Sequence, residues 1–227
     1  MNPSSSKGRV VVTCGPSYEP IDEVRRITNH STGQLGFCLS NRLARAGWEV
    51  LCLKGVGALH ADLERGVERL PFSTNDHLLE RLTAIPQREE ITAVFHAAAL
   101  CDFKVGHSLD ADGRPVESAK ISSRAGEITL VLTPATKLIG HMRGLFPKAA
   151  LIGWKYELNG DRADVVEKGI RQLTENHTDL CVLNGRAFGR GFGILEGQEV
   201  VAELRDKETL ADWFAEWLVQ RAVRLSA

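Results

Sequence analysis

The sequence contains no hydrophobic run of membrane-spanning length and no excess of charge of one sign. Its 227 residues include 28 lysines and arginines and 29 aspartates and glutamates, which gives a formal net charge of -1. Proteins that bind nucleic acid or anionic membranes through a broad basic face need a surplus of positive charge. We therefore expect no nucleic-acid partner and no membrane association, and any anion site has to be a local cluster of residues.

Cysteines are few, and none of the five forms a Cys-x-x-Cys pair. This absence excludes a metal site held by thiolates. At least three cysteines lie within apolar runs, which is typical of reduced, buried thiols and predicts a cytoplasmic location. The polar residues 1–8 contain no apolar segment that would act as a secretory signal, and we interpret them as a disordered lead-in.

Several motifs of nucleotide-binding and catalytic proteins are also missing. No Gly-x-Gly-x-x-Gly follows the first expected strand, and no Gly-x-x-x-x-Gly-Lys-Ser/Thr occurs, which disfavours a standard dinucleotide fold and a P-loop. A Gly-x-Ser-x-Gly elbow is absent as well. Neither Tyr18 nor Tyr156 has a lysine four residues on, which leaves a nicotinamide-dependent reductase as a weaker alternative.

What the sequence does contain is an alternation of apolar strands and amphipathic helices. Strands are expected at residues 9–14, 48–54, 67–70, 91–99, 149–154 and 179–183, and helices at about 33–47, 75–85, 161–175 and 206–224. Continuous apolar strands separated by such helices are typical of a parallel sheet covered on both faces. The pattern predicts an α/β, Rossmann-like, doubly wound fold with a mainly parallel sheet, in a single domain over residues 9–227.

Residues 103–132 interrupt this alternation. They are rich in glycine, aspartate and serine and end in an alternating strand at 127–132, so we expect a strand-rich flap that projects from the sheet. Thr133 and Pro134 then suit the cap and the first turn of the next helix. A further hairpin is expected at 194–204.

The polar segments that follow the strands are the candidates for ligand binding, because doubly wound sheets bind ligands beyond the carboxyl ends of their strands. These segments are Cys14–Ser17, Leu100–Asp102, Lys155–Glu157, and Asn184 with the loop 189–193. We expect all of them to meet at one edge of the sheet.

The segment from Arg25 to Gly36 is the most informative of the chain. Ser31 and Gln34 have the spacing of a capping box, so a helix is expected to begin here. Gly33 and Gly36 would allow a ligand to approach the backbone closely. The free N–H groups of a helix amino terminus bind anions, phosphate above all. An ordinary capped helix after a loop is the alternative.

Five stretches carry a resemblance to a known family. They are Cys14–Gly36 with its Asn-His-Ser-Thr-Gly sequence, Ala97–Phe103, Ala119–Ser123, Leu151–Glu157 and Asp179–Asn184. In this order they resemble the phosphopantothenoylcysteine synthetases (phosphopantothenate–cysteine ligases), from about residue 9 to the last helix. The form resembled is the stand-alone synthetase, without the flavin-binding decarboxylase domain found in many bacterial members.

The resemblance implies a ligase of coenzyme A biosynthesis that works in two steps. The carboxylate of 4'-phosphopantothenate attacks the α-phosphorus of a nucleoside triphosphate, which gives an acyl-nucleotidylate and pyrophosphate. The amine of L-cysteine then displaces the nucleotide to form an amide. Negative charge collects at one place in both steps, so preorganised donors and Mg²⁺ are expected and a flavin is not. The resemblance leaves CTP or ATP open and implies a cytoplasmic homodimer.

The resemblance also implies roles for particular residues, although it does not indicate the metal ligands. The asparagine of the family's Asn-His-Ser-Thr/Ser-Gly motif falls on Asn29, which would hold the acyl-nucleotidylate; a loop-structuring role is the alternative. Substrate or phosphate binding is implied for Arg25, Gly33, Gly36, Asp102 and Lys120. Nucleotide binding is implied for Gly15, Ser17, Gly153, Trp154, Lys155, Arg171, Asp179, Asn184 and Phe192. Core packing is the alternative for Trp154 and Phe192. The alternative for Lys120 is a solvated lysine on a hairpin. The alternative for Asp102 is a residue that only ends a strand.

Three positions depart from the family pattern and bear on activity. Arg171 stands where the family has a lysine that acts on the nucleotide phosphates, and Glu175 stands where it has a second lysine. Arginine keeps the charge but not the compact ammonium group. Lys168, one turn earlier, is the alternative source of that charge. Leu183 also replaces a family alanine. A diverged nucleotide-binding relative without ligase activity is therefore the alternative function.

Overall fold

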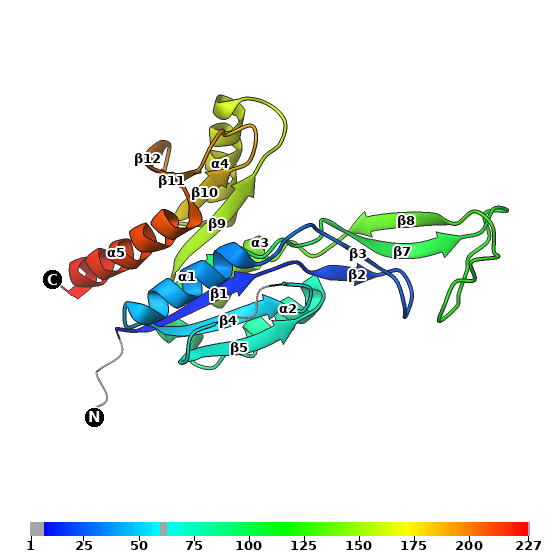
Figure 1. Ribbon diagram of the computed structural model, residues 1–227, viewed down its shortest axis with the longest axis horizontal. Helices are drawn as coiled ribbons and strands as arrows, with labels where there is room; N and C mark the ends of the chain where they lie inside the picture. Colours follow the sequence, from blue (N-terminus) through cyan, green and yellow to red (C-terminus); the bar gives the residue numbers. More distant parts are fainter. Residues whose placement is uncertain (1–6, 60–62, 227) are drawn as a thin grey trace.

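The computed structural model describes residues 7–59 and 63–226, and an eight-stranded sheet runs through its body (Figure 1). The strand order is β12-β11-β10-β9-β6-β1-β4-β5. The strands are β1 (Arg9–Cys14), β4 (Glu49–Gly55), β5 (Val67–Phe72), β6 (Ile91–His96), β9 (Ala150–Tyr156), β10 (Leu180–Asn184), β11 (Phe192–Glu196) and β12 (Glu199–Leu204). The strands from β10 to β5 pair in parallel, and β11 and β12 add antiparallel at one edge. The expected Rossmann-like, mainly parallel α/β fold is confirmed.

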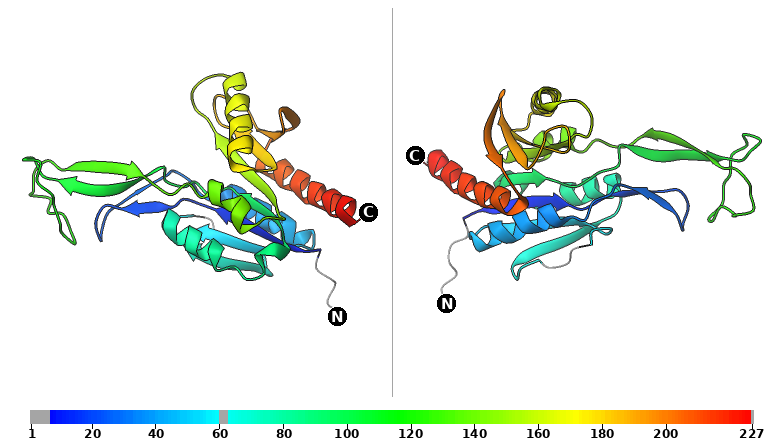
Figure 2. Two further views of the ribbon diagram at one scale, coloured as in Figure 1. Left: turned by 180° about the vertical axis from the view of Figure 1, so that it is seen from behind. Right: turned by 45° about the horizontal axis from the view of Figure 1, so that its top comes forward.

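Helices cover both faces of this sheet (Figure 2). On one face lie α1 (Gln34–Arg45) and α5 (Lys207–Ser226); on the other lie α2 (Asn75–Thr83), α3 (Ile139–Leu145) and α4 (Arg162–Asn176), with the short η1 (Arg88–Glu90) before β6. Alternate residues of one strand serve the two cores: Val10 and Val12 lie under α1 and α5, and Val11 lies under α2 and α3. We call these two sides the α1 face and the α4 face.

Residues 103–134 form a two-stranded arm that leaves the sheet, at the right of Figure 1. Its strands, β7 (Phe103–Leu109) and β8 (Thr129–Pro134), pair antiparallel, and residues 110–128 connect them. The arm confirms the projecting flap. Its second strand runs to Pro134, which lies opposite Phe103.

A short hairpin beside the arm was not expected from the sequence. Its strands are β2 (Tyr18–Pro20) and β3 (Arg26–Thr28). The turn between them is bonded to the arm, since the Glu23 N–H donates to the Ala119 carbonyl at 3.0 Å. The hairpin therefore links the loop after β1 to the far part of the arm.

Some expected boundaries are wrong. Thr133 and Pro134 end β8 and do not start a helix; α3 begins at Ile139. Proline at the end of a strand removes no essential ladder bond, so it fits there as well as at a helix start. The strand expected at 91–99 ends at His96, because the next residues follow the loop after β1 in irregular pairing.

Two of the residues expected to form a disordered lead-in, Lys7 and Gly8, are hydrogen-bonded to the body. The Lys7 N–H donates to the Gly47 carbonyl at 3.2 Å, and the Gly8 carbonyl accepts the Glu49 N–H at 3.0 Å. These two residues are therefore joined to the body, and residues 1–6 lie outside the described part of the chain.

The cysteines agree with the expectation of reduced, buried thiols. All five cysteines are free; four are buried, and Cys38 is half-buried. In the described ranges, none of the helices combines the length and the apolar character needed to cross a membrane.

Candidate active site at the carboxyl edge of the sheet

The carboxyl ends of β1, β6, β9 and β10 meet at one edge, as expected, because these strands are parallel neighbours. Backbone contacts tie the segments that follow them. Pro16 forms a bridge with Ala99, and the Glu157 N–H donates to the Asn184 carbonyl at 3.0 Å. These segments form one contiguous surface, which we call the carboxyl edge.

Asn29 lies at this edge, on the loop that leads from β3 into α1. Its side-chain amide donates to the Leu100 carbonyl at 2.7 Å, which fastens the loop to the segment after β6. A hollow of about 310 Å³ opens beside it, lined by Pro16, Arg26, Thr28, Asn29, His30, Ser31, Thr32, Gly57 and Leu59. Arg26 lies over the Tyr18 ring at 4.7 Å. Guanidinium, amide and hydroxyl groups in one hollow suit an anionic ligand.

The capping box expected before α1 is wrong. The helix begins at Gln34, its N-cap is Gly33 with φ of 77°, and no side chain caps it. Gln34 is thus the first helical residue and not the third, so it does not reach back to Ser31; its Oε1 accepts from Lys207 Nζ at 2.6 Å. The left-handed Gly33 sets the helix start and offers no side chain as a cap, while the Gln34 N–H donates to Thr32 Oγ1 at 3.3 Å.

Gly33 and Gly36 are required by close packing. A Cβ on Gly36 would lie 2.1 Å from Cys14 Cβ, and a Cβ on Gly33 would lie 2.9 Å from Ala58 Cβ. These glycines therefore let α1 and its entry loop lie directly on the strands. Their contact with phosphate stays a prediction.

Gly15 and Ser17 shape the loop after β1. A Cβ on Gly15 would lie 2.6 Å from Ala58 Cβ. Ser17 is fully buried, and its Oγ accepts the Cys101 N–H at 2.9 Å. The Ser17 hydroxyl therefore orients the segment after β6, while nucleotide contact by either residue stays a prediction.

Trp154 and Asn184 lie near the ends of β9 and β10 on the α1 face. Trp154 packs 6.2 Å from the Phe214 ring of α5, and Asn184 follows the core residue Val182 by two positions. Trp154 Nε1 and Asn184 Oδ1 are buried without a hydrogen-bond partner in the described part of the chain. Buried polar groups are nearly always bonded, so this donor and this acceptor are exceptions within the described residues. Phe192 is buried in the same core.

On the α4 face, the carboxyl edge carries a lysine–glutamate–lysine cluster. Glu157 lies 2.7 Å from Lys168 Nζ through one oxygen and 3.2 Å from Lys155 Nζ through the other. The hydrogen bond from Lys168 is the main cause that lowers the pKa of Glu157. The cluster keeps a net positive charge, which suits a phosphate group. The sequence placed Glu157 in the candidate segment Lys155–Glu157 but assigned it no role. Its position two residues after Lys155 puts both side chains on one face.

Gly153 lies on the same face, deeper in the sheet. A Cβ there would lie 2.5 Å from Gln172 Nε2 and 2.9 Å from Ile139 Cδ1. Glycine at this position therefore allows α3 and α4 to pack on β9, which is a reason for Gly153 independent of any nucleotide.

The structure does not bring Arg171 to the carboxyl edge. Arg171 is exposed and pairs with Glu167 at 3.2 Å. It lies one turn further along α4 than Lys168, whose ammonium group reaches Glu157 at the edge. Lys168 is therefore better placed than Arg171 to act on a phosphate.

Asp179 lies at the opposite end of β10 from Asn184. Roughly 17 Å of strand separates the two residues. The Asp179 carboxylate accepts the Leu151 N–H and pairs with Arg143, both at 2.7 Å. Asp179 thus joins strand and helix ends at the amino edge, away from the other candidate residues.

Arg25 and Lys120 lie together beside the arm. Arg25 donates from both Nη atoms to the Ile121 carbonyl at 3.0 Å and pairs with Asp22 at 2.7 Å. Roughly 13 Å of extended chain separates Arg25 from Asn29. Lys120 is exposed. Within one chain, these two cations do not join the residues around Asn29.

Asp102 is exposed where the arm leaves the sheet. Its carbonyl accepts the Ala135 N–H at 2.9 Å. In the sequence, Asp102 is two residues from Leu100, the hydrogen-bond partner of Asn29. Its contact with a substrate stays a prediction.

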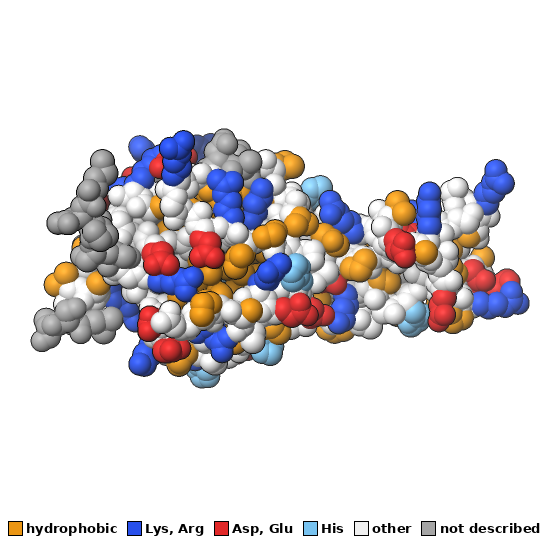
Figure 3. Space-filling view, turned by 90° about the horizontal axis from the view of Figure 1, so that it is seen from below, with side chains coloured by type: hydrophobic (Ala, Val, Ile, Leu, Met, Phe, Trp, Pro, Cys, Tyr) orange, Lys and Arg blue, Asp and Glu red, His pale blue; other side chains and the backbone are white. Residues whose placement is uncertain are grey.

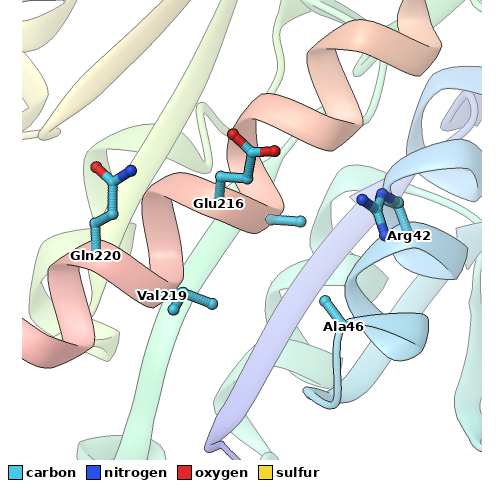
Figure 4. Close-up of a pocket in the computed structure, with 6 residues that line it drawn as sticks. Arg42, Ala46, Glu216, Val219 and Gln220 are labelled. Carbon is cyan, nitrogen blue, oxygen red and sulfur yellow. The ribbon is translucent and has the colours of Figure 1, made fainter.

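Another hollow, of about 330 Å³, lies between α1 and α5 (Figure 4). Arg42 and Ala46 line it at the carboxyl end of α1, facing Glu216, Val219 and Gln220 of α5. It lies at the other end of α1 from Gly33 and is separate from the carboxyl edge.

Metal-ligating side chains do not converge at the site. Over residues 7–59 and 63–226, no group of three or more His, Cys, Asp or Glu side chains is placed to hold a metal ion. The described residues thus offer no ready-made protein cage for a divalent cation.

Comparison with known proteins places this geometry in a family. The sequence model for the DNA/pantothenate metabolism flavoprotein C-terminal domain matches residues 5–215. The chain is 29% identical over 209 residues to the coenzyme A biosynthesis bifunctional protein CoaBC of Thermococcus kodakarensis, covering 91% of this chain and 47% of that protein. It is 35% identical over 186 residues to CoaBC of Vibrio parahaemolyticus, covering 81% of this chain and 43% of that protein. The chain spans less than half the length of these relatives.

Solved structures share the fold. The DNA/pantothenate metabolism flavoprotein from Streptococcus pneumoniae superposes with a TM-score of 0.83 at 23% identity, over 94% of this chain and 99% of that one. A Cab2 variant in complex with phosphopantothenate-cysteine gives a TM-score of 0.72 at 15% identity, over 96% and 87%. Together with the match over residues 5–215, they confirm the resemblance carried by the motifs. The chain belongs to the family of DNA/pantothenate metabolism flavoprotein C-terminal domains.

Proposed function

We propose that this chain is a phosphopantothenate–cysteine ligase, which joins 4'-phosphopantothenate to L-cysteine through an acyl-nucleotidylate. The observation that carries the proposal is the position of Asn29, bonded to Leu100 beside a hollow that Arg26 and the residues before α1 line. Relatives named for coenzyme A biosynthesis, and a fold neighbour solved with phosphopantothenate-cysteine, support the same chemistry.

Asn29 would act on the acyl-nucleotidylate and on the transition states on either side of it. Its amide has two N–H groups, of which Leu100 takes one, so the other remains for a ligand. In the first step the substrate carboxylate attacks the α-phosphorus and pyrophosphate leaves. In the second, the cysteine amine attacks the acyl carbon, the nucleoside monophosphate leaves, and the amine loses a proton. A neutral donor stabilises the charge that develops without binding the ground state equally well.

The nucleotide would occupy the carboxyl edge between α1 and the ends of β9 and β10. The unpartnered Asn184 Oδ1 and Trp154 Nε1 supply an acceptor and a donor on the α1 face. Lys155 and Lys168 supply charge for the phosphates on the α4 face. We assign the phosphate-binding cation to Lys168 and not to Arg171. Neither CTP nor ATP is favoured by these groups, because both present donors and acceptors.

Mg²⁺ fits this site as an ion carried by the triphosphate. The described residues hold no cluster of three ligating side chains, and Mg²⁺ usually keeps phosphate oxygens and water as its ligands. When bound, it would neutralise charge on the phosphates. The chain's own contribution is to bind and orient the triphosphate through Lys155, Lys168 and the first turn of α1.

A cytoplasmic homodimer that pairs through the arm completes the proposal. Phe103 and Leu132 are 52% and 44% exposed on the arm, and Figure 3 shows hydrophobic side chains on its surface as well as on the body. Leu132 pairs with Val105, two residues from Phe103, so the three lie on one face. Two-stranded elements are marginal alone. In a dimer, Arg25 and Lys120 of one copy would lie at the site of the other copy and contact its substrate. The free cysteines support the proposed cytoplasmic location, because thiols stay reduced there.

The proposal is tested by incubating the protein with Mg²⁺, 4'-phosphopantothenate, cysteine and either CTP or ATP. Release of pyrophosphate that depends on phosphopantothenate supports the ligase, and the faster nucleotide identifies the co-substrate. Nucleotide binding without pyrophosphate release would instead favour the diverged relative.

A further inference from the structure

One buried side chain is hydrogen-bonded to both segments that connect the arm to the body. Asn75, the first residue of α2, donates from Nδ2 to the Cys101 carbonyl at 2.8 Å and to the Thr136 carbonyl at 3.0 Å. Cys101 lies where the chain enters the arm and Thr136 where it leaves. The Ala135 N–H also donates to the Asp102 carbonyl at 2.9 Å. Asn75 therefore clamps both ends of the arm to α2.

This position is costly for an asparagine. Asn75 is 1% exposed, and its Oδ1 has no hydrogen-bond partner among the residues that the structure describes. Burial of an amide with an unpartnered atom is unfavourable. The Asn75 backbone N–H donates to Oε1 of the buried Glu19 at 3.3 Å, which adds β2 to the clamp. The favourable contribution of the Asn75 side chain is its two hydrogen bonds to the ends of the arm.

The clamped segment is also the one that orients Asn29. The Leu100 carbonyl accepts from Asn29, the Cys101 N–H donates to Ser17 Oγ at 2.9 Å, and the Cys101 carbonyl accepts from Asn75. Successive polar groups of one backbone segment are thus fixed by side chains from three different parts of the chain. Movement of this segment away from α2 would move the carbonyl on which the Asn29 amide rests.

We propose that Asn75 is a positioning residue for the reaction at Asn29: it holds Leu100–Asp102 against α2 and so places the carbonyl that orients the Asn29 amide. The kinetic part of this inference rests on the proposed ligase function, and the structural part rests on the hydrogen bonds alone. Asn75 is neither among the residues that line the hollow nor among the groups proposed to bind the nucleotide, which are Trp154, Lys155, Lys168 and Asn184. Its loss therefore affects the rate of the chemical step and not the affinity for the nucleotide.

The test uses Asn75→Ala in the full-length chain. A catalytic donor displaced by about 1 Å costs on the order of 10²-fold in rate, so kcat is expected to fall by roughly 10- to 100-fold while the KM for the nucleotide stays constant. Amide hydrogen exchange, followed by mass spectrometry, is expected to quicken in residues 97–103 and also in 27–32. Asp76→Asn is the matched control, because Asp76 contacts Thr136 and Lys104 beside the clamp but not the segment under Asn29.

Each outcome decides between a positioning role and a purely structural one. Faster exchange in 97–103 with unchanged exchange in 27–32 and unchanged kcat would overturn the proposal, because the clamp would then serve only the arm. A raised nucleotide KM at constant kcat would overturn it as well. If the wild type releases no pyrophosphate, the ligase proposal fails, while exchange in 27–32 still tests the clamp. If alanine prevents folding, Asn75→Ser keeps one donor and is expected to give an intermediate kcat; wild-type kcat in that variant would contradict the proposal.

Discussion

The Asn29 side-chain amide donates to the Leu100 carbonyl at 2.7 Å, although 71 residues separate them in the chain. This bond joins the loop before α1 to the segment after β6, the two connections that leave the centre of the sheet in different directions. Doubly wound sheets bind their ligands at such a point. The bond fixes one N–H of the amide, and in the proposed reaction the other N–H would donate to the reacting groups.

Replacement of Asn29 by alanine or aspartate is expected to lower turnover by ~10²–10³ while nucleotide binding persists, because a single donor to a developing charge is worth that much. Steady-state pyrophosphate release and nucleotide binding by calorimetry measure the two effects. Asn176→Asp, at the last residue of α4 and away from the carboxyl edge, is the control for a generic Asn-to-Asp change. Near-wild-type turnover in the Asn29 variants would remove this residue from the mechanism.

Lys168→Ala is expected to raise the nucleotide KM about tenfold, or ~1.4 kcal/mol of binding, and Arg171→Ala is expected to leave it unchanged. The reason is that Lys168 reaches Glu157 at the carboxyl edge, whereas Arg171 is exposed and pairs with Glu167. Initial-rate kinetics at varied nucleotide concentration provide the measurement. A raised nucleotide KM in Arg171→Ala but not in Lys168→Ala would assign the phosphate-binding role to Arg171. If neither variant changes the KM, this face of α4 is only a solvated surface.

The fold is expected to lose stability between pH 7 and pH 5 partly through His96. This residue lies 2.9 Å from Thr13 Oγ1, and burial lowers its pKa from 6.5 to about 4. Between these values the unfolded chain binds a proton that the folded chain does not, so stability falls as the pH falls. At pH 5, this difference in proton binding lowers the free energy of unfolding by about 2 kcal/mol. Urea denaturation should therefore show a smaller loss for His96→Gln than for the wild type; parallel losses would contradict the assignment.

The protein is expected to sediment as a dimer at micromolar concentration and to become monomeric when Phe103 and Leu132 are both changed to serine. Removing exposed apolar area from a strand pair takes away the surface that a second copy would cover. Val201→Ser is the control, because Val201 is a similarly exposed residue on β12. A wild-type monomer, or a serine double variant that stays dimeric, would place the interface elsewhere or remove it.

Much of the architecture was predictable because the buried strands are continuous apolar segments. Val10, Val11 and Val12 alternate between two cores, which is why their run indicates a strand covered on both sides. The hairpin of β2 and β3 gave no such signal, since each strand has three residues and mixed polarity. The helix α1 begins close to the expected residue, but its cap was assigned wrongly, because the left-handed Gly33 is the N-cap in place of Ser31.

The candidate site was predictable only where one segment carries it. Asn29 and the loop before α1 follow from a local motif, and the structure places them beside a hollow. Contacts made by distant residues were not predictable: Glu157 joins Lys168 from the next helix, and Asn75 reaches Thr136 across 61 residues. Asp179 shows the converse, since a motif resemblance selected it although its carboxylate faces Arg143 at the other edge.

The most direct test of the ligase follows oxygen from substrate to product. Phosphopantothenate labelled with ¹⁸O in its carboxylate is incubated with the wild type, Mg²⁺, cysteine and the active triphosphate, and the nucleoside monophosphate is examined by mass spectrometry. If the carboxylate attacks the α-phosphorus and cysteine then attacks the acyl carbon, one ¹⁸O atom appears in the monophosphate. Unlabelled monophosphate, or label found in inorganic phosphate, would contradict an acyl-nucleotidylate and with it the role assigned to Asn29.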